Sequence, residues 1–446
     1  MRILSACLML VTLFAMPAAG AGGKQQSVPG VENVRVKTLA NGLKVVVWPD
    51  KDIPNVALYN WYKVGSRNEY AGITGISHFF EHMMFNGTTT RKPGEFDRNM
   101  EANGGANNAY TSSDVTVYQD WFPRSALGTI FDLEGDRMAN LSFDPKVIES
   151  ERGVVYSERR SSIDNDNLGA LIEQIDATAF TAHPYQIPTI GWPSDIEAWT
   201  IDDLKTFYRT YYAPNNAVMF VVGDVEADEI FALAEKHIGG IPAQPAPRAI
   251  TTKEPEQTGE RRIEMKRPAQ TPLLVFAHHG LRGNDPDMPA LQLLISILSD
   301  GNSSRLQREL VDTQQLAVDI GSQVGIGFDP SLVYLYALLP SGGNLAKTES
   351  ALDAMLTEIG NKGVSQAELD KARRQKLAAF WRSMSTISGK AQAMGGYEVF
   401  SGDYRKLFDA PAQFERVTVA DIQRVASKLF RRENRTVGFV AQSPSK

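Results

Sequence analysis

Two stretches of the sequence decide the fold: TIDDLKTFYRTYYAPNNAVMFVV at residues 200–222 and TVADIQRVASKLFRRENRTVGFV at residues 418–440. Each begins with a threonine that can cap an amphipathic helix, passes through a polar turn and ends in an apolar strand. The two threonines and the two strands align at a near-constant offset of about 218 residues, which indicates an internal duplication. The sequence therefore predicts two copies of one domain.

The 446 residues of the chain suit two domains of about 200 residues each. Residues 241–260 are rich in proline and polar residues and follow neither a helical nor a strand period, so we predict a linker there. The N-terminal domain then spans residues 30–240 and the C-terminal domain residues 261–446. The second copy has no counterpart of the histidine cluster in the first.

The first copy mixes strands and helices. Residues 34–36 and 43–48 flank the turn signal Ala40-Asn41-Gly42 and predict a hairpin. The other predicted elements are strands at residues 56–62 and 110–121, and helices at residues 73–85, 125–140 and from the Asp144-Pro145 pair onward. This mixture predicts an α/β or α+β domain in which helices cover a sheet.

The N-terminal residues have the pattern of a secretory signal peptide. A positive start at Met1-Arg2-Ile3 leads into an apolar run through Met16, and small residues follow up to Ala21. A membrane anchor is the alternative, but the run is shorter than the ~20 residues that a spanning helix needs. A lipid-attachment site at Cys7 is excluded because the apolar run follows this cysteine. We therefore predict cleavage of residues 1–21 and a secreted or periplasmic protein.

Charge and cysteine content exclude several classes of function. The formal net charge is −6, whereas nucleic-acid-binding proteins typically carry an excess of basic residues. Cys7 is the only cysteine, so the mature chain would have no disulfide, thiol nucleophile or thiolate metal site. No later segment is apolar enough to span a bilayer, and we predict no stable membrane insertion.

The sharpest chemical signal is His78-Phe79-Phe80-Glu81-His82. On a helix, positions i and i+4 share one face, so both imidazoles can reach one cation, and Glu81 lies beside them. Two neutral imidazoles suit Zn²⁺, and a nearby carboxylate can take a proton from an activated water. This is the inverted form of the HExxH arrangement. The structural alternative is a pair of core histidines beside a solvated glutamate.

A catalytic zinc ion needs a third protein ligand, and the helix after Asp144 offers candidates. Glu151 and Glu158 are seven residues apart, hence on one helix face. One can bind the metal while the other orients a ligating histidine. Spacing alone does not decide between them, and both can instead belong to an exposed charged face.

These residues resemble the pitrilysin/insulinase (M16) zinc metallopeptidases, most closely the branch that contains mitochondrial processing peptidase and its bacterial relatives. The resemblance covers nearly the whole mature chain. Further matching residues are Gly75, Phe85-x-Gly87-Thr88, Asn108-Ala109-Tyr110-Thr111, Tyr118, His183-Pro184-Tyr185, Ile190-Gly191 and Ser303-Ser304-Arg305-Leu306.

The resemblance implies an α+β fold with two similar domains, each a mixed, mostly antiparallel sheet covered by helices. It implies that His78, His82 and Glu158 bind one Zn²⁺ per chain. Glu81 would be the general base. Glu151 would be a supporting carboxylate of the catalytic site that does not itself bind the metal. The strand around Asn108, Ala109 and Tyr110 would pair with the backbone of peptide substrates, although an ordinary sheet strand is the alternative.

One departure from the family pattern concerns the second half. Active members place an Arg and a Tyr, seven residues apart, where this chain has Val311 and Val318. Neither valine side chain can donate a hydrogen bond to substrate. We therefore expect a homo- or heterodimer in which a second M16-like chain supplies the Arg and Tyr.

Three functions agree with these observations. The first is a zinc-dependent endopeptidase or oligopeptidase. The second is a non-catalytic scaffold subunit of an M16-like assembly, against which the complete His78-Glu81-His82 motif argues. The third is a zinc hydrolase that acts on substrates other than peptides.

Overall fold

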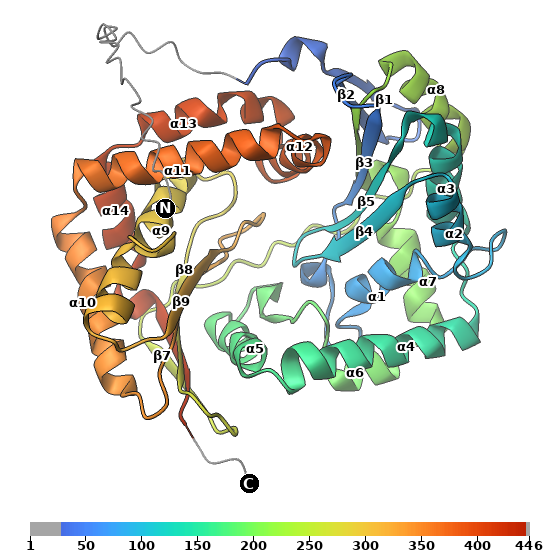
Figure 1. The fold of residues 1–446 in the computed structure, drawn as a ribbon. Helices are drawn as coiled ribbons and strands as arrows, with labels where there is room; N and C mark the ends of the chain where they lie inside the picture. The colour runs from blue at the N-terminus through green and yellow to red at the C-terminus, as the bar shows by residue number, and fades with distance from the viewer. Residues whose placement is uncertain (1–27, 443–446) are drawn as a thin grey trace, which may run out of the picture.

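The computed structural model describes residues 28–442 and contains two sheets, each covered by helices (Figure 1). The first sheet has six strands in the order β1-β2-β6-β3-β5-β4, and the second has five in the order β7-β11-β8-β10-β9. In each sheet one pair is parallel, β2 with β6 and β7 with β11, and the other pairs are antiparallel. The predicted α+β fold of two similar, mostly antiparallel domains is therefore confirmed.

The strands are β1 (Arg35–Thr38), β2 (Lys44–Pro49), β3 (Asn55–Tyr62), β4 (Ala106–Thr111), β5 (Thr116–Pro123), β6 (Ala217–Gly223), β7 (Arg261–Met265), β8 (Leu273–His279), β9 (Asp319–Val324), β10 (Leu332–Leu338) and β11 (Arg435–Val440). The helices are α1 (Ile76–Met83), α2 (Glu95–Ala102), α3 (Leu127–Asn140), α4 (Pro145–Arg159), α5 (Asn167–Ala179), α6 (Pro193–Ala198), α7 (Ile201–Tyr211), α8 (Ala227–His237), α9 (Met288–Ser299), α10 (Leu345–Lys362), α11 (Gln366–Met384), α12 (Ile387–Ser401), α13 (Ala410–Arg416) and α14 (Val419–Leu429).

The repeated sequence stretches form equivalent units. Thr200 caps α7 and Thr418 caps α14, and each shares a reciprocal capping box with the aspartate three residues later. A short 3₁₀ turn then leads into β6 or β11, each of which lies inside its sheet. The same local chemistry therefore ends both halves.

The predicted strand at residues 110–121 was wrong in its extent, because these residues belong to two strands. β4 and β5 form a hairpin whose turn spans residues 112–115. The Ser112 hydroxyl accepts hydrogen bonds from the backbone N–H groups of Asp114 and Val115, so a polar side chain stabilises the turn. The hairpin places β4 at the edge of the first sheet.

The two halves exchange helices. One face of each sheet packs on helices of its own half, but the opposite face packs on a helix of the other half. α12 of the second half lies against β3 and β6, and α5 of the first half lies against β11 and β8 (Figure 1). At α12 the approach is close, because a Cβ atom on Gly395 would lie 2.2 Å from the Trp61 ring. The predicted domain boundaries at residues 240 and 261 stay predictions.

A buried charged cluster also joins the halves. Arg67 pairs with Asp114 at 2.7 Å and with Asp329 of the second half at 2.5 Å. The Tyr185 hydroxyl donates to Asp114, and His183 Nε2 lies 3.2 Å from Asp329. Because an unpaired buried charge is costly, these contacts favour one relative position of the halves.

Within residues 28–442, none of the helices has both the length and the apolar character needed to cross a membrane. The predicted signal peptide, residues 1–21, lies outside the described residues.

Candidate metal centre

Helix α1 carries three of the predicted site residues, His78, Glu81 and His82. It begins later than predicted and ends earlier, spanning Ile76–Met83 rather than residues 73–85. The helix cannot start earlier because its N-cap, Gly75, has a φ of 85°, which favours glycine. The buried Glu69 carboxylate accepts from the N–H groups of Gly75 and Ser77, each at 2.7 Å. This cap gives partners to two N–H groups that have none within the helix, and it fixes the orientation of α1.

Helix α4 carries the other two carboxylates, Glu151 and Glu158, and packs against α1. It begins as predicted, with the Asp144 side chain accepting from Lys146 N–H at 2.8 Å and Pro145 in the first turn. It continues directly into a π-helical turn at Arg160–Asp164. There the hydroxyls of Ser161 and Ser162 donate to the Glu158 carbonyl, at 2.9 and 2.8 Å. These bonds support the backbone of Glu158.

The two helices bring His78, His82 and Glu158 together. One ligand atom from each residue lies within 4.8 Å of the other two. Glu158 Oε2 is 3.6 Å from His78 Nε2 and 3.4 Å from His82 Nε2. A tetrahedral zinc ion with bonds of about 2.0–2.2 Å requires ligand atoms about 3.4 Å apart. The three residues therefore fit a zinc ion with one open coordination position.

The ligand set also has suitable charge states. Burial and the neighbouring His82 lower the pKa of His78 to about 4, so its imidazole is neutral at pH 7. Burial lowers the pKa of His82, but hydrogen bonds to Glu151 and Glu158 outweigh it and raise this pKa to about 9. The hydrogen bond from His82 lowers the pKa of Glu158, which is therefore ionised. A metal cation would take the place of the proton on His82 Nε2.

Glu151 lies behind His82 rather than beside Glu158. Its Oε1 is 2.7 Å from His82 Nδ1, so the carboxylate can accept from Nδ1–H and leave Nε2 directed toward Glu158 and His78. Spacing left the roles of Glu151 and Glu158 open. The geometry favours Glu158 as the ligand and Glu151 as the residue that orients His82.

We expect Glu151→Ala to weaken zinc binding by about 10- to 100-fold, because the loss of a carboxylate behind a ligating histidine typically has this effect. Competition with a chromophoric chelator measures the affinity. Glu149→Ala on the same helix is the matched control, since the Glu149 side chain is 78% exposed and pairs with Arg152. An affinity of Glu151→Ala within about twofold of the control would contradict this role.

Glu81 connects the metal centre to the edge strand. Its Oε2 accepts a hydrogen bond of 2.7 Å from the Thr111 hydroxyl at the end of β4. Burial raises the pKa of Glu81, and the Thr111 bond only partly opposes this shift. A carboxylate with a raised pKa is suited to accept and release a proton near neutral pH.

The predicted substrate strand is the edge strand β4, which among residues 28–442 pairs only with β5. Its free side leaves backbone N–H and C=O groups without a strand partner. Ala109 packs into the core beneath α1, whereas Tyr110 packs on the opposite face, edge-on to Trp61 at 6.3 Å. Asn108 is exposed. The strand therefore reaches the candidate metal centre at Thr111, and its free edge can accept another strand.

The other histidines among the described residues lie elsewhere. His278 and His279 point to opposite faces of β8, where His278 packs on Phe430 and His279 Nε2 lies 3.0 Å from the Ala179 carbonyl. His237 Nδ1 lies 3.4 Å from Asp132 at the end of α8. Within the described part of the chain, only the group of His78, His82 and Glu158 has metal-ligand geometry.

The two valines of the second half lie in different environments. Val311 is in the turn Gln307–Thr313 and packs against the second core. Val318 directly precedes β9, and its side chain is 55% exposed. In neither place can the valine side chain donate a hydrogen bond.

Sequence reasoning missed two contributors to the site. Glu69 fixes the start of α1 from outside any local motif, and no sequence signal would have identified it. Thr111 belongs to the quoted segment Asn108-Ala109-Tyr110-Thr111 but received no role. The contact of the Thr111 hydroxyl with Glu81 can be inferred only when β4 is known to end beside α1.

Comparisons with known proteins agree with this geometry. Residues 45–192 match the family model "Insulinase (Peptidase family M16)", and residues 198–376 match "Peptidase M16 inactive domain". The chain is 35% identical to zinc protease PqqE of Helicobacter pylori over 97% of this chain and 96% of that one. It is 27% identical to the beta subunit of the mitochondrial-processing peptidase of Lentinula edodes, over 88% and 86% of the two chains.

A crystal structure of a protease from Helicobacter pylori superposes with a TM-score of 0.88 and 33% identity, covering 91% of this chain and 99% of that one. The resemblance seen in the sequence is thus confirmed across both halves. The chain belongs to peptidase family M16, the insulinase family, and its relatives are zinc proteases.

Proposed function

We propose that this chain is a zinc-dependent endopeptidase or oligopeptidase. One arrangement carries the proposal: the ligand atoms of His78, His82 and Glu158 lie together, and Glu81 on the same helix is hydrogen-bonded to the edge strand. A place for one metal ion and a place for extended peptide backbone are therefore adjacent.

Each residue has a distinct part in the proposed reaction. His78, His82 and Glu158 would hold one Zn²⁺ per chain. When bound, zinc polarises the scissile carbonyl and lowers the pKa of the attacking water. Glu81 takes a proton from that water and passes it to the leaving amine, for which its raised pKa is suited. Glu151 keeps His82 in position.

The free edge of β4 is the proposed substrate-binding element. An extended peptide can add to Asn108, Ala109 and Tyr110 as a further strand through main-chain hydrogen bonds. This mode makes few demands on the substrate sequence, so we expect a range of peptides to bind. Glu81 then reaches the bound backbone from α1, beside the end of the strand.

We further propose that a second, different M16-like chain completes the active site in a heterodimer, because a homodimer of this chain would contain the same two valines. The support is the pair Val311 and Val318, which cannot stabilise a developing oxyanion. The alternative is a non-catalytic scaffold subunit of an M16-like assembly, with which the "inactive domain" match of the second half agrees.

Residence outside the cytoplasm is also proposed. It rests on the signal-peptide pattern of residues 1–21, and the structural relative PqqL of Escherichia coli is described as a periplasmic protease. N-terminal sequencing of the protein from the periplasmic fraction should begin at residue 22. A start at Met1 would contradict this proposal.

The proposed function is tested with the purified chain and quenched fluorescent peptides. We expect the chain to bind zinc and to cleave only weakly without a partner. A chelator should abolish this cleavage and added zinc should restore it, since the bound metal would activate the attacking water. Strong cleavage by the chain alone would contradict the need for a partner. Bound zinc without cleavage would favour the dimer in which another chain supplies the Arg and Tyr. Absence of both zinc and cleavage would overturn the proposed function.

A further inference from the structure

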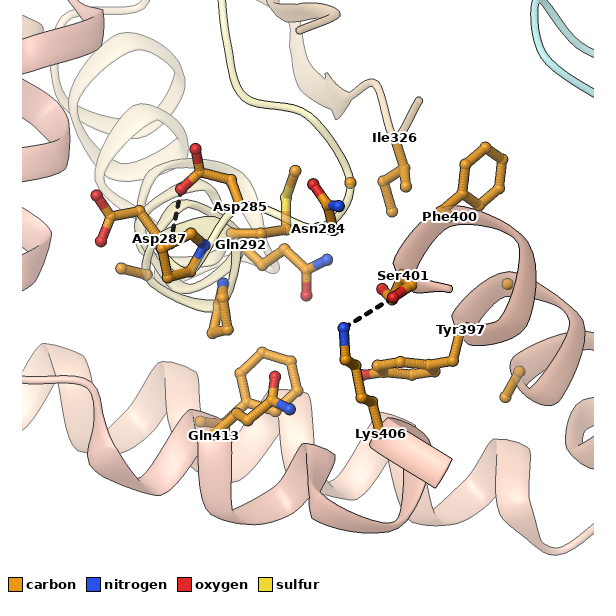
Figure 2. A pocket seen from close by; sticks show the side chains of 18 of the residues that line it. Asn284, Asp285, Asp287, Gln292, Ile326, Tyr397, Phe400, Ser401, Lys406 and Gln413 are labelled. Atoms are coloured by element: carbon orange, nitrogen blue, oxygen red, sulfur yellow. Dashed lines mark hydrogen bonds between the residues drawn. The ribbon is translucent and has the colours of Figure 1, made fainter. Parts of the chain in front are cut away.

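A cavity of about 790 Å³ lies between the two halves, away from the metal centre. From the first half it is lined by Trp61 of β3 and by Tyr110, Ser112 and Val115 of the β4–β5 hairpin. Most of the remaining lining comes from the loop before α9 and the start of α9, from α12 and from α13, with single residues such as Ile326 and Lys406 between them (Figure 2). Its volume lies within the range of about 300–1,000 Å³ typical of ligand pockets.

The side chains of β4 connect this cavity to the metal centre. Thr111 donates to Glu81, and Ala109 packs beneath α1, so these two residues face the metal side of the sheet. Tyr110 lies between them in sequence and lines the cavity on the other side. Since successive side chains of a strand point to opposite faces, the two sites lie on opposite faces of one edge strand.

A peptide added to the free edge of β4 would show the same alternation. If one of its side chains faces the metal centre, each neighbouring side chain faces the side of the cavity. We propose that this cavity is a specificity pocket, which takes a bulky, uncharged side chain of the peptide bound along β4. The inference rests on the proposed function and adds a preference for one type of residue.

The lining explains the choice of a bulky, uncharged side chain. The walls near β4 are aromatic: Trp61 packs edge-on to Tyr110 at 6.3 Å and to Phe400 at 6.5 Å. Gln392 donates to the Tyr110 hydroxyl at 2.9 Å and so holds this ring in place. Ordered aromatic rings favour burial of another large apolar group.

Most charged residues of the lining have partners of opposite charge just outside it. Asp287 and Asp421 pair with Arg424, and Arg416 pairs with Asp409. Lys406 donates to the Ser401 carbonyl at 2.7 Å, and Asp285 lies on the opposite side of the cavity (Figure 2). With both signs present, neither an acidic nor a basic side chain is clearly favoured.

Gly396 offers a way to fill the cavity. It lines the cavity from α12, and a Cβ atom there would meet no atom within 4 Å. Its neighbour Gly395 is different, because a Cβ there would collide with Trp61. Gly396→Trp should therefore occupy the cavity without displacing the helix. Gly128→Trp is the matched control, since Gly128 is an exposed helical glycine on α3 with equally open space.

The test uses the full chain with Glu81→Gln, loaded with zinc, so that peptides bind but are not consumed. Fluorescence anisotropy gives the Kd of labelled decapeptides of alanine and serine in which one position at a time is tryptophan. We expect at least one tryptophan position to tighten binding about 10-fold, as burial of one large side chain can do. This gain should persist with Gly128→Trp and disappear with Gly396→Trp, while the Kd of the plain peptide stays the same.

Two outcomes would overturn the pocket: no tryptophan position improves binding, or the gain survives Gly396→Trp. Cleavage of the same peptides by the chain with Glu81 intact is measured separately. Tryptophan-dependent binding by a chain that neither retains zinc nor cleaves would contradict the peptidase but support the pocket. Cleavage without a tryptophan preference would support the peptidase and contradict the pocket. Thermal unfolding of both glycine variants checks that they are folded.

Discussion

Replacing Glu81 by glutamine is expected to reduce kcat/KM for peptide hydrolysis by about 10³-fold, while the chain keeps its zinc. General base catalysis typically contributes 10²- to 10⁴-fold, and a glutamine amide cannot take the proton of the attacking water. The substitution preserves the shape of the side chain, and its amide oxygen can still accept from the Thr111 hydroxyl. Glu81 is not one of the three residues with ligand geometry, so the metal site should remain.

Steady-state cleavage of a quenched peptide and zinc analysis of the same preparation check this result together. Glu149→Gln is the matched control, because this carboxylate is largely exposed on α4. Activity of Glu81→Gln above about a tenth of the control would show that another group acts as base, since the remaining factor would fall below that of general base catalysis.

Removing a ligand should have the second large effect. For His78→Ala and for Glu158→Ala we expect zinc to fall from about one ion per chain to near zero after dialysis, with loss of peptidase activity. Two remaining ligands cannot hold a catalytic zinc ion that three normally hold. His78 has no other partner, because its Nδ1 is buried without a hydrogen bond and its Nε2 faces Glu158.

His237→Gln provides the histidine control for this experiment. This residue lies at the end of α8 beside Asp132, and its loss should leave zinc content and activity unchanged. Elemental analysis and cleavage assays on the three variants give the comparison. A full complement of zinc in His78→Ala or in Glu158→Ala would remove that residue from the ligand set.

The sequence predicted those features that local chemistry determines. The capping boxes of Thr200 and Thr418 form because each threonine is followed three residues later by an aspartate. His78 and His82 share one face because helical periodicity places them there. The start of α4 follows from the Asp144-Pro145 pair.

Features that depend on distant residues were not predictable. The spacing of Glu151 and Glu158 could not show which one lies behind His82, because that depends on how α4 packs against α1. The turn at residues 112–115 was missed because its side-chain hydrogen bonds compete with an alternating strand pattern. The exchange of α5 and α12 between the halves depends on tertiary packing alone, and so does the cavity that α12 helps to form.

Because of the helix exchange, both halves of the chain flank the strand proposed to bind substrate. The first half supplies both the proposed metal ligands and the edge strand, and the second half covers the opposite face of the same sheet. Thr111, on the metal side of the sheet, and Tyr110, on the side covered by the second half, are therefore neighbours on β4. In this arrangement the second half can influence substrate choice even though Val311 and Val318 provide no hydrogen-bond donors.

The most direct test of the central claim is X-ray diffraction at the zinc absorption edge from crystals of the Glu81→Gln chain with a bound peptide. We expect one anomalous peak about 2.0–2.2 Å from the ligand atoms of His78, His82 and Glu158, and a peptide paired with β4. A zinc peak at other residues, or a peptide bound away from β4, would contradict the account.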